Sequence, residues 1–497
     1  MLSEKDLLKL QNGSDIRGVA VEGVANENVN LTAEAVNLIA SGFVKFLSDK
    51  LGKKDLKIAI GHDSRITADK LKIAAIKSLV ANGAKVLDCG LSSTPAMFMS
   101  IIFADTKVDG AIMLTASHLP FNRNGMKFFT ADGGLEKSDI TKILKNAANF
   151  SEIDADISTV EKFDLIGLYS AHLCKIIRDK LNLGDKPLSG MKIIVDAGNG
   201  GGGFFAEKVL KTLGADITGS QFLEPDGHFP NHIPNPEDKI AMAAIKKAVL
   251  DNRADLGLIF DTDVDRMSAV LSNGEEISRN ALIAMMAAIL APDYPNSTII
   301  TDSVTSDGLH KFLENELHLK HHRFKRGYKN VINECIRLNK AGEISPLAIE
   351  TSGHGALSEN YYLDDGAYLA VKLLIAATHA HKNNKNLSSL IEKLEYPAEA
   401  VEYRLKILAD DFKTYGETVL ETFKIRAIEN NLKLAEPNFE GVRIIFDNGW
   451  ALLRLSLHDP LMPLNVESNE IGGCKKIIGV INNLLKDFNQ LDLSLLK

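Results

Sequence analysis

Three aspartates alternate in the stretch "DTDVDR", which runs from Asp261 to Arg266. The stretch follows the apolar segment "ADLGLIF", which is typical of a buried strand. Carboxylates this close together repel one another unless a cation neutralises them. Because every candidate ligand atom is a hard oxygen, Asp261, Asp263 and Asp265 predict a Mg²⁺ site rather than a zinc site.

An EF-hand and a solvated turn fit these aspartates less well. An EF-hand also begins with alternating aspartates, but its pattern needs Gly and Glu where this chain has Arg266 and Ser272. A solvated acidic turn is the simplest alternative. It is disfavoured because the triplet lies at the carboxyl end of a predicted strand, where open α/β sheets bind ligands.

A second candidate is Ser117, in the stretch "TASHLPFNRNGMKFF" from Thr115 to Phe129. The G-x-S-x-G pattern of an esterase is absent there, and a neighbouring His118 does not by itself make a catalytic triad. A serine that caps a helix or closes a turn remains an alternative. A Mg²⁺ ion held by three carboxylates keeps open coordination positions, and a phosphoserine oxygen would fill one.

A third stretch, "IETSGHGAL", follows the apolar run "PLAI" and contains Glu350, Ser352 and His354. A carboxylate, a hydroxyl and an imidazole in a glycine-containing loop suit hydrogen bonds to sugar hydroxyls. The same residues could instead only cap the next helix.

A fourth stretch, "LLRLSLHDP", alternates Arg454, Ser456 and His458 on a predicted strand that runs into a loop. An arginine with a hydroxyl suits a phosphate, although an amphipathic strand has the same spacing. Arg17 in "GSDIRG" and Arg65 in "GHDSR" also stand where core strands end, and Arg65 is expected to contact substrate.

The elements that must position these residues repeat along the chain. A strand, a polar loop, a helix and a second strand recur in "LKIAIGHDSR" to "GAKVLDCGL", in "MKIIVDAGNGGGG" to "GADITGSQ", and in "STIITDSVTSDGL" to "HHRFKRGYKN". Such crossover units favour largely parallel sheets, so we expect an α/β protein with three related domains. The tail differs: "GVRIIFDNGWALLRLSL" is typical of a hairpin and predicts a smaller α+β domain with an antiparallel sheet.

The expected domains are 1–160 with the serine loop, 161–272 with the aspartate loop, 273–395 with the "ETSGH" loop, and 396–497 with the "RLSLHDP" loop.

Composition excludes several classes of protein. The net charge of −8 argues against a nucleic-acid partner. No run approaches the ~20 apolar residues of a spanning helix, and "MLSEKDLLKL" is no signal peptide, so no membrane partner is expected. The four cysteines are widely spaced, which is typical of reduced thiols in a cytoplasmic protein.

These motifs, in this order, resemble the α-D-phosphohexomutase family of phosphoglucomutases and phosphomannomutases over nearly the whole chain. "TASHLP" looks like the active-serine loop of the family, "DTDVDR" its magnesium loop, "ETSGH" its sugar-specificity loop, and "GYKN" its G-x-K loop. "PDGHFPNHIPNPE", Pro225 to Glu237, resembles the stretch that follows the second crossover.

The resemblance implies four domains around a central cleft and a phosphosugar substrate. A phosphate on Ser117 would pass to a hexose 1-phosphate through a bound hexose 1,6-bisphosphate, with Mg²⁺ held by Ser117 and the three aspartates. The further implied roles are charge stabilisation and proton transfer for Arg17, His118, Lys127 and Arg266, sugar contacts for Lys329, Glu350, Ser352 and His354, and phosphate contacts for Arg454, Ser456 and His458.

Two departures stand out. Leu119 replaces the usual Asn of the serine loop, and Leu457 and His458 replace Gly and Thr of the last loop. The alternatives are a phosphoglucosamine mutase and a non-catalytic sugar-phosphate-binding homologue.

Overall fold

The computed structural model describes residues 2–456 and 459–496. These form two compact units. The first unit comprises Met1–Leu282 and Ser352–Leu390, and the second comprises Ile283–Thr351 and Ile391–Lys497. Each unit is described by itself.

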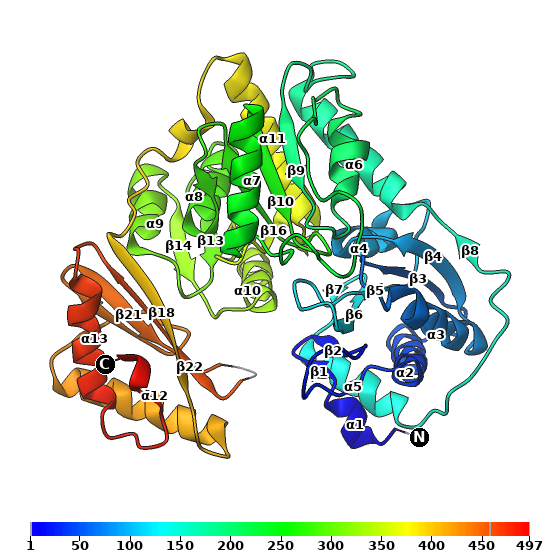
Figure 1. The fold of residues 1–497 in the computed structure, drawn as a ribbon, viewed down its shortest axis with the longest axis horizontal. Coiled ribbons are helices and arrows are strands. Elements are labelled where there is room, and N and C mark those ends of the chain that lie inside the picture. The colour runs from blue at the N-terminus through cyan, green and yellow to red at the C-terminus, as the bar shows by residue number, and fades with distance from the viewer. Residues whose placement is uncertain (1, 457–458, 497) are drawn as a thin grey trace. The chain divides into compact units, whose positions relative to one another are not determined.

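The first unit begins with a mixed sheet, blue to cyan in Figure 1, in the order β1-β2-β6-β5-β3-β4-β8, with β7 paired to β6. Its strands are β1 (Gln11–Asn12), β2 (Asp15–Val19), β3 (Lys57–His62), β4 (Lys85–Leu91), β5 (Gly110–Leu114), β6 (Arg123–Thr130), β7 (Gly133–Gly134) and β8 (Glu161–Lys162). β3 pairs in parallel with β4 and β5, and β5 pairs antiparallel with β6. The predicted parallel crossover is therefore confirmed here.

The helices of this domain are α1 (Glu4–Leu8), α2 (Ala33–Leu51), α3 (Ala68–Ala81), α4 (Thr94–Ile102) and α5 (Lys137–Ala147). Apolar residues of α2, α3 and α5 share one core with residues of β2, β3, β5 and β6. Local signals fix the ends of α2: the Thr32 side chain accepts a hydrogen bond from Ala35 N, and Gly52 ends the helix in the left-handed conformation. α4 packs against β5 and β6 and begins beside the aspartate loop.

The second α/β domain, also in the first unit, has the sheet order β12-β11-β10-β9. Its elements are α6 (Leu165–Leu181), β9 (Ile193–Asp196), η1 (Phe205–Leu210), α7 (Lys239–Asn252), β10 (Leu256–Phe260), β11 (Met267–Leu271) and β12 (Glu276–Ile277). β9 and β10 are parallel, whereas β10 and β11 are antiparallel. The loop between β10 and β11 is "DTDVDR".

One expected strand of this domain is reduced to fragments. The stretch "GADITGSQ" makes only isolated bridges, Lys192 to Asp216 and Asp196 to Gln221. The interruption has a local cause, because the Asp216 side chain accepts a hydrogen bond from Thr218 N and Gly219 has φ +102°.

The third α/β region contributes to both units. The second unit contains β13 (Thr298–Thr301), α9 (Asp307–Lys311), η2 (Phe312–Glu316), β14 (Lys320–Arg323), α10 (Tyr328–Lys340) and β15 (Leu347–Ile349). β13 pairs in parallel with both β14 and β15, as the third crossover unit predicts. The first unit contains β16 (Gly355–Leu357), η3 (Ser358–Asn360), β17 (Leu363–Asp364) and α11 (Gly366–Lys382). α8 (Arg279–Leu290) and η4 (Leu387–Ile391) lie where the chain passes between the units.

The C-terminal domain, gold to red in Figure 1, is an antiparallel sheet with helices, as predicted. Its sheet order is β18-β22-β21-β20-β19. The elements are β18 (Glu399–Lys406), α12 (Phe412–Glu429), β19 (Lys433–Leu434), β20 (Val442–Phe446), β21 (Gly449–Leu453), β22 (Leu461–Ser468), α13 (Gly473–Leu485) and η5 (Ser494–Leu496). Phe446 pairs with Gly449, which confirms the hairpin predicted from "DNG".

Within the second unit, polar side chains connect the third α/β region to the C-terminal domain. The Arg443 guanidinium lies over the Trp450 ring, 3.7 Å from its centroid, and donates to Asp307 Oδ1 at 2.9 Å. Trp450 Nε1 donates to Glu467 Oε2 at 2.9 Å.

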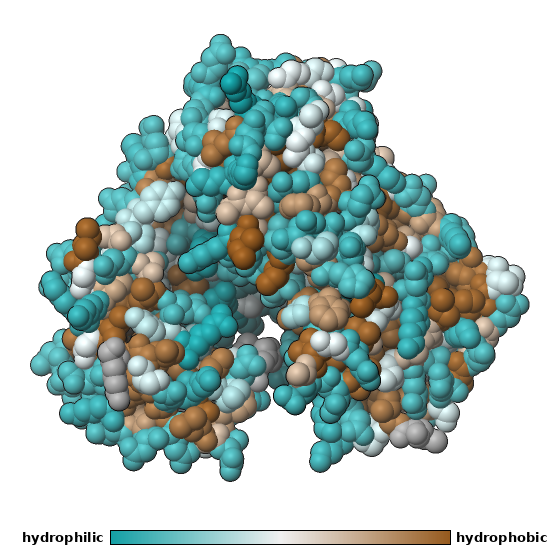
Figure 2. Space-filling view, viewed as in Figure 1, coloured by the Kyte–Doolittle hydropathy of each residue, from teal (hydrophilic) through white to brown (hydrophobic). Residues whose placement is uncertain are grey.

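Hydrophilic residues cover most of the face seen in Figure 2, and hydrophobic residues are scattered among them. Among the described residues, we find no helix with the length and apolar character needed to cross a bilayer.

Candidate active site

Ser117 lies just past the carboxyl end of β5, in a buried and conformationally unusual turn. Its φ of +50° is in the left-handed region, which few non-glycine residues adopt. Ser117 N donates to Thr115 Oγ1 at 2.9 Å, which closes the turn. The Ser117 hydroxyl donates to Asp261 Oδ2 at 2.8 Å, so the serine loop meets the aspartate loop of the next domain. Strain of this kind is a feature of functional sites.

Arg65 holds the serine loop in place. The side chain is 2% exposed. Nη2 donates to the carbonyls of Ser117 at 2.5 Å and Leu119 at 2.6 Å, and Nη1 donates to those of Pro120 and Arg123, both at 2.8 Å. The Arg65 guanidinium is thus buried and donates to four carbonyls, and the contact with substrate expected from the sequence stays a prediction. The loop uses the main chain of Leu119, so the unusual side chain there leaves this contact intact.

The three aspartates of "DTDVDR" converge on one point. One carboxylate oxygen from each of Asp261, Asp263 and Asp265 lies within 4.8 Å of the others, and all three side chains are buried. Val264 in the same loop has φ +65°, a strained value for a β-branched residue. The turn between β10 and β11 therefore presents the alternating carboxylates together rather than on opposite sides.

Two cationic side chains compensate these carboxylates. Lys127, on β6, lies with Nζ 3.0 Å from Asp263 Oδ2 and also hydrogen-bonds Asp265. Arg266 Nε lies 3.1 Å from Asp261 Oδ2. Burial and the charge of Asp265 raise the pKa of Asp261 well above its usual range. Burial also acts to raise the pKa of Asp265, but Lys127, His354 and Arg266 outweigh it and hold that pKa low.

The donor set fits a hard divalent cation. All candidate ligands are carboxylate oxygens, and Asp263 Oδ1 and Asp265 Oδ1 are buried without a hydrogen bond from any described residue. A buried charged oxygen that accepts no hydrogen bond is costly, and a bound cation removes that cost.

Thr94 is a site residue that the sequence pattern did not indicate. It opens α4, and its hydroxyl donates to Asp263 Oδ2 at 2.5 Å while its main-chain N donates to Asp263 O at 2.8 Å. The sequence "SSTPAMF" signals only a helix start, with Ser93 as the cap.

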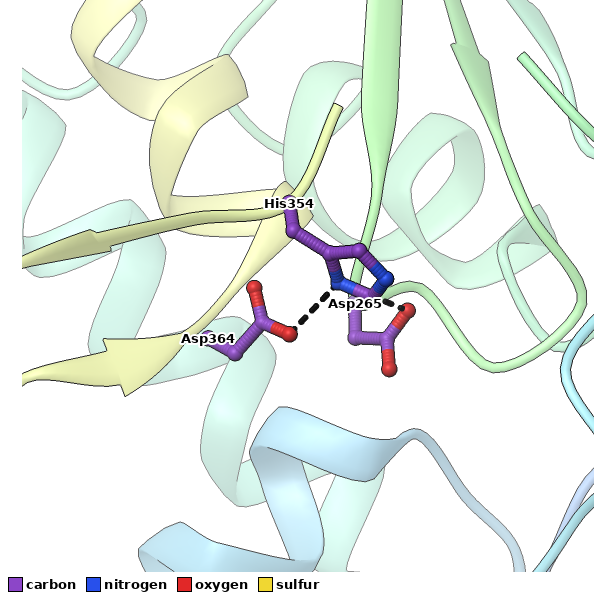
Figure 3. Close-up of side chains that lie close together, drawn as sticks. All are labelled: Asp265, His354 and Asp364. Carbon is purple, nitrogen blue, oxygen red and sulfur yellow. Dashed lines mark hydrogen bonds and ion pairs between the residues drawn. The ribbon is translucent and has the colours of Figure 1, made fainter. Parts of the chain in front are cut away.

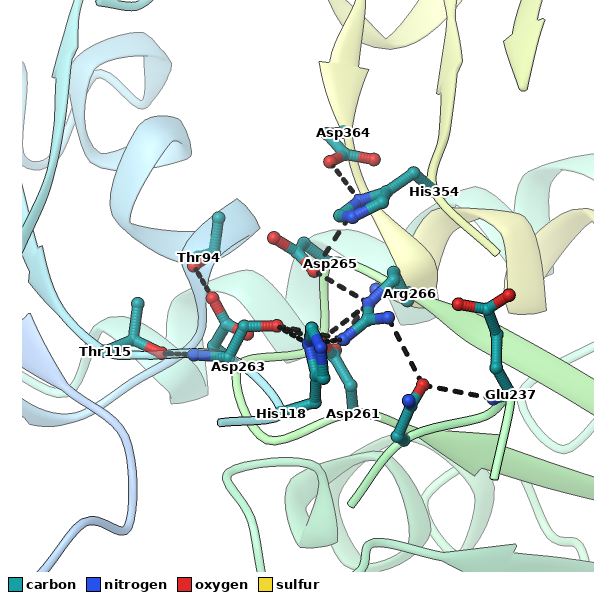
Figure 4. A network of polar contacts seen from close by, with 12 residues as sticks. Thr94, Thr115, His118, Glu237, Asp261, Asp263, Asp265, Arg266, His354 and Asp364 are labelled. Atoms are coloured by element: carbon teal, nitrogen blue, oxygen red, sulfur yellow. Dashed lines mark hydrogen bonds and ion pairs between the residues drawn. The ribbon is translucent and has the colours of Figure 1, made fainter. Parts of the chain in front are cut away.

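Arg266 and His118 flank the Ser117 hydroxyl. Arg266 Nη2 donates to Ser117 Oγ at 3.0 Å and to His118 Nδ1 at 2.6 Å. Figure 4 shows the imidazole and the guanidinium facing each other. Burial, together with the charges of Arg266 and Arg17, lowers the pKa of His118 to about 2. His118 is therefore a neutral acceptor that orients Arg266 in this arrangement, rather than a charged proton donor.

Arg17, on β2, adds positive charge near the same carboxylates. It donates to Asp15 Oδ2 at 2.9 Å. Burial acts to lower the pKa of Arg17, but Asp15, Asp263 and Asp265 outweigh it and raise the pKa.

His354 joins the "ETSGH" loop to this cluster (Figure 3). Its Nδ1 donates to Asp364 Oδ2 at 2.6 Å and lies 3.7 Å from Asp265 Oδ1. Burial opposes the charge, yet Asp364 and Asp265 raise the pKa of His354 to about 9. The loop can lie close to the start of β11 because residue 353 is a glycine: its φ is +94°, and a Cβ there would lie 2.8 Å from Met267 O. Ser352 is buried in the same loop, and Asp364 is a further site residue that no sequence motif indicated.

Glu350 and Lys329 belong to the second unit. Glu350 Oε1 accepts a hydrogen bond from Gly327 N at 2.6 Å, which ties the end of β15 to the start of α10. Lys329 lies in the first turn of α10, so the "GYKN" stretch and Glu350 are brought together.

Arg454 and Ser456 follow β21 in the second unit. Arg454 Nε is buried and donates no hydrogen bond to any described residue. Burial and the charge of Arg326 lower the pKa of Arg454. Ser456 Oγ accepts a hydrogen bond from Asp459 N at 3.2 Å. His458, the third residue predicted for this loop, lies outside the described residues.

Comparison with known proteins agrees with this geometry. Three models of the phosphoglucomutase/phosphomannomutase family match in order: alpha/beta/alpha domain I at residues 9–153, domain II at 169–274 and domain III at 278–396. A phosphomannomutase/phosphoglucomutase of Pseudomonas aeruginosa is 28% identical, with 95% of this chain and 94% of that protein covered. A Methanosarcina barkeri protein named "Probable phosphoglucosamine mutase" is 29% identical over 93% of this chain and 96% of its own length.

A solved structure supports the fold. The phosphoglucomutase/phosphomannomutase family protein of Burkholderia thailandensis has a TM-score of 0.78 at 24% identity, with 98% of each chain covered. The three family matches, taken with the assembled serine and aspartate loops, show that this chain is a hexose-phosphate mutase of the α-D-phosphohexomutase family.

Proposed function

We propose that the chain interconverts hexose 1-phosphate and hexose 6-phosphate, with glucose and mannose as the sugars, by carrying a phosphoryl group on Ser117. The observation that carries the proposal is the position of the Ser117 hydroxyl. Its oxygen lies 2.8 Å from Asp261 Oδ2 and 3.0 Å from Arg266 Nη2. A phosphate acceptor needs such a setting, with a cation site on one side and a fixed positive charge on the other.

The proposed cycle has two balanced transfers. In the first, the O–P bond at Ser117 breaks, the phosphoryl group bonds to the C6 oxygen of hexose 1-phosphate, the C6 hydroxyl proton leaves, and the serine oxygen takes up a proton. This gives a free serine and bound hexose 1,6-bisphosphate. In the second, the sugar presents its C1 phosphate: the O–P bond at C1 breaks, the phosphoryl group bonds to Ser117 Oγ, whose proton leaves, and the C1 oxygen takes up a proton, which gives hexose 6-phosphate.

Arg266 is the main protein charge at the transferred group. Negative charge develops on the serine oxygen as the phosphoryl group leaves, and Arg266 Nη2 already donates to that oxygen. His118 holds the same nitrogen through Nδ1, so the guanidinium does not have to reorient. Mg²⁺ bound by Asp261, Asp263, Asp265 and the phosphoserine would act as a Lewis acid that offsets phosphoryl charge.

Lys127 and Arg17 support the reacting end. Lys127 keeps the carboxylates compensated, and Arg17 brings a further cation near Asp263 and Asp265. Both then favour the arrival of an anionic phosphosugar.

The sugar is proposed to contact Glu350, Ser352, His354 and Lys329. A charged His354 can donate to a sugar hydroxyl or phosphate, which the pKa of about 9 supports. The phosphate that is not reacting is proposed to bind Arg454 and Ser456, since the Arg454 Nε proton lacks a partner among the described residues.

A substrate panel tests this function. We expect turnover of glucose 1-phosphate or mannose 1-phosphate that requires Mg²⁺ and rises with a hexose 1,6-bisphosphate activator. The similarity to the Methanosarcina barkeri protein makes glucosamine 1-phosphate the second candidate, so it belongs in the panel together with its N-acetyl form. Binding of these sugars without turnover of any would support the non-catalytic alternative instead.

The proposed setting is the reducing cytoplasm. All four cysteines are free and buried, which suits a compartment that keeps thiols reduced.

A further inference from the structure

The segment "PDGHFPNHIPNPE", from Pro225 to Glu237, links the second crossover to α7 and contains a buried histidine. The His232 side chain is 1% exposed and its Asp196 partner 0%. Asp196 ends β9, so the pair joins this segment to the sheet.

Both ring nitrogens of His232 face atoms that only accept hydrogen bonds. Nε2 lies 3.1 Å from each oxygen of Asp196, and Nδ1 lies 2.9 Å from the Ile233 carbonyl oxygen. The Asp196 carboxylate already accepts from Gly198 N at 2.9 Å and Gln221 Nε2 at 2.7 Å. Since an ionised carboxylate and a carbonyl have no proton to offer, a ring that carries hydrogen on both nitrogens, an imidazolium, satisfies both contacts.

The surroundings of the ring are consistent with this charge. Burial acts to lower the pKa of His232, but Asp196, the Ile233 carbonyl and Asp238 outweigh it and raise the pKa. Phe222 packs edge to face at 5.3 Å and brings no charge.

A chain of hydrogen bonds runs from this imidazolium to the reacting serine. The Ile233 carbonyl that His232 binds also accepts from Asn235 N at 2.8 Å. Asn235 Oδ1 then accepts from Glu237 N at 3.1 Å and from Arg266 Nη1 at 3.2 Å. The other nitrogen of that guanidinium, Nη2, is the one 3.0 Å from Ser117 Oγ.

The turn that presents Asn235 has little room to move. Gly198, with φ +53°, lies so close that a Cβ there would be 2.9 Å from Pro234 Cβ and 3.3 Å from His232 Cε1. His118 Nδ1 accepts a hydrogen bond from Nη2 of Arg266, and Asn235 Oδ1 accepts one from Nη1.

We propose that His232, as an imidazolium held by Asp196, is a positioning residue that sets Arg266 against Ser117 through the Ile233 carbonyl and Asn235. The inference rests on the proposed function, because it assigns the effect to the phosphoryl transfer at Ser117. Loss of the His232 proton turns one of its two contacts into a repulsion between lone pairs. Asn235 is then no longer held in place by the turn, and Arg266 loses its hydrogen bond to Asn235 Oδ1.

The test compares His232→Gln with His228→Gln as a matched control. His228 belongs to the same segment and also contacts an aspartate, Asp226, at 3.0 Å, but its side chain is 68% exposed. We expect His232→Gln to lower kcat about tenfold or more with little change in KM, because a misplaced Arg266 weakens transfer rather than sugar binding. His228→Gln should match the wild type. A kcat of His232→Gln within twofold of the wild type would overturn the proposal.

A double-mutant cycle separates positioning from loss of stability. Asn235→Ala removes the contact with Arg266 and leaves the His232–Asp196 pair in place. If His232 acts through Asn235, His232→Gln should cost kcat little once Asn235→Ala is present. Additive losses would show that the histidine acts by another route and would overturn the proposal.

The protonation state is measured without any assay of activity. Long-range ¹H–¹⁵N spectra of histidine-labelled wild type should show one imidazolium ring at pH 7.5 that is absent from His232→Gln. A neutral ring at His232 would contradict the inference even if the enzyme is active. Wild type that turns over no hexose phosphate would instead count against the proposed function.

Discussion

The ammonium of Lys127 lies 3.0 Å from Asp263 Oδ2, on a carboxylate that is also a candidate metal ligand. The side chain is 6% exposed and bonds Asp265 as well. In the proposed function, a lysine from the first domain and Mg²⁺ would together neutralise the aspartate loop of the second domain.

Lys127→Met should therefore make the protein depend more on its metal. Without Mg²⁺, the buried carboxylates lose a partner, and the free energy of unfolding should fall by about 3–5 kcal/mol. Saturating Mg²⁺ should recover much of this loss because the ion supplies the missing charge. Thermal denaturation with EDTA and with Mg²⁺ measures the difference.

The control is Lys142→Met, which removes a lysine whose side chain is 67% exposed. It should change the melting temperature neither with EDTA nor with Mg²⁺. If Mg²⁺ raises the melting temperature of Lys127→Met no more than that of the wild type, the two cations do not share the site.

Arg65→Lys should damage both the fold and the serine loop. Lysine carries its donors on one nitrogen, so it cannot reach the four carbonyls that Arg65 binds. We expect the free energy of unfolding to fall by about 3 kcal/mol and kcat to fall more than about tenfold. Urea denaturation and steady-state kinetics give both values.

The control is Arg404→Lys, whose side chain is 71% exposed and pairs with Glu402. A normal kcat in Arg65→Lys would mean that Ser117 is positioned without the hydrogen bonds from Arg65 to the four carbonyls.

Glu467 should give stability a pH dependence near neutrality. Burial raises its pKa to about 7, against the lowering effects of Trp450 and Arg443. Its folded pKa lies above the unfolded value, so its contribution is fully present below about pH 4.3 and is lost as pH rises through 7. Glu467→Gln, which keeps an acceptor for Trp450, should gain up to about 2–3 kcal/mol relative to wild type between pH 5 and pH 8.

Urea denaturation at both pH values measures this relative gain. Glu470→Gln, with a side chain 51% exposed, is the control. A stability difference between Glu467→Gln and wild type that stays constant with pH would show that the carboxyl does not titrate in this range.

Glu350→Gln should change specificity more than fold. Its amide oxygen can still accept from Gly327 N, so the link between β15 and α10 survives. The lost charge should lower kcat/KM about tenfold or more for a sugar whose hydroxyl it binds, and less for the others. The panel of hexose 1-phosphates measures each factor.

Glu395→Gln, with a side chain 66% exposed and an ion pair to Lys311, provides the comparison. An equal loss for every sugar would assign Glu350 a structural role in place of a selective one.

Local features of the fold and the site could be predicted from the sequence. A buried strand followed by alternating aspartates predicted a cation site, because only a cation offsets that much charge at a strand end. Because a cation held by three carboxylates keeps open coordination positions, this site also suggested that the Ser117 hydroxyl carries a phosphate. The C-terminal hairpin was equally local, since "DNG" joins two apolar strands.

The remaining features depend on residues far apart in the chain. Arg65 resembles any polar residue at a strand end until the fold brings the carbonyls of Ser117 and Leu119 onto it. The low pKa of His118 comes from burial and from Arg266 in another domain, and Thr94 reaches Asp263 only because α4 begins there. "GADITGSQ" failed to form a full strand because an aspartate turn outcompeted its β-pattern.

The phosphoserine is the central claim, and labelling tests it most directly. Wild-type protein incubated with Mg²⁺ and ³²P-labelled hexose 1,6-bisphosphate should acquire label on the peptide that contains Ser117. An excess of unlabelled hexose 1-phosphate should then remove the label and release it as bisphosphate and hexose 6-phosphate. Ser117→Ala should take up no label and show no turnover. Label on any other residue, or turnover by folded Ser117→Ala, would contradict the phosphoserine mechanism.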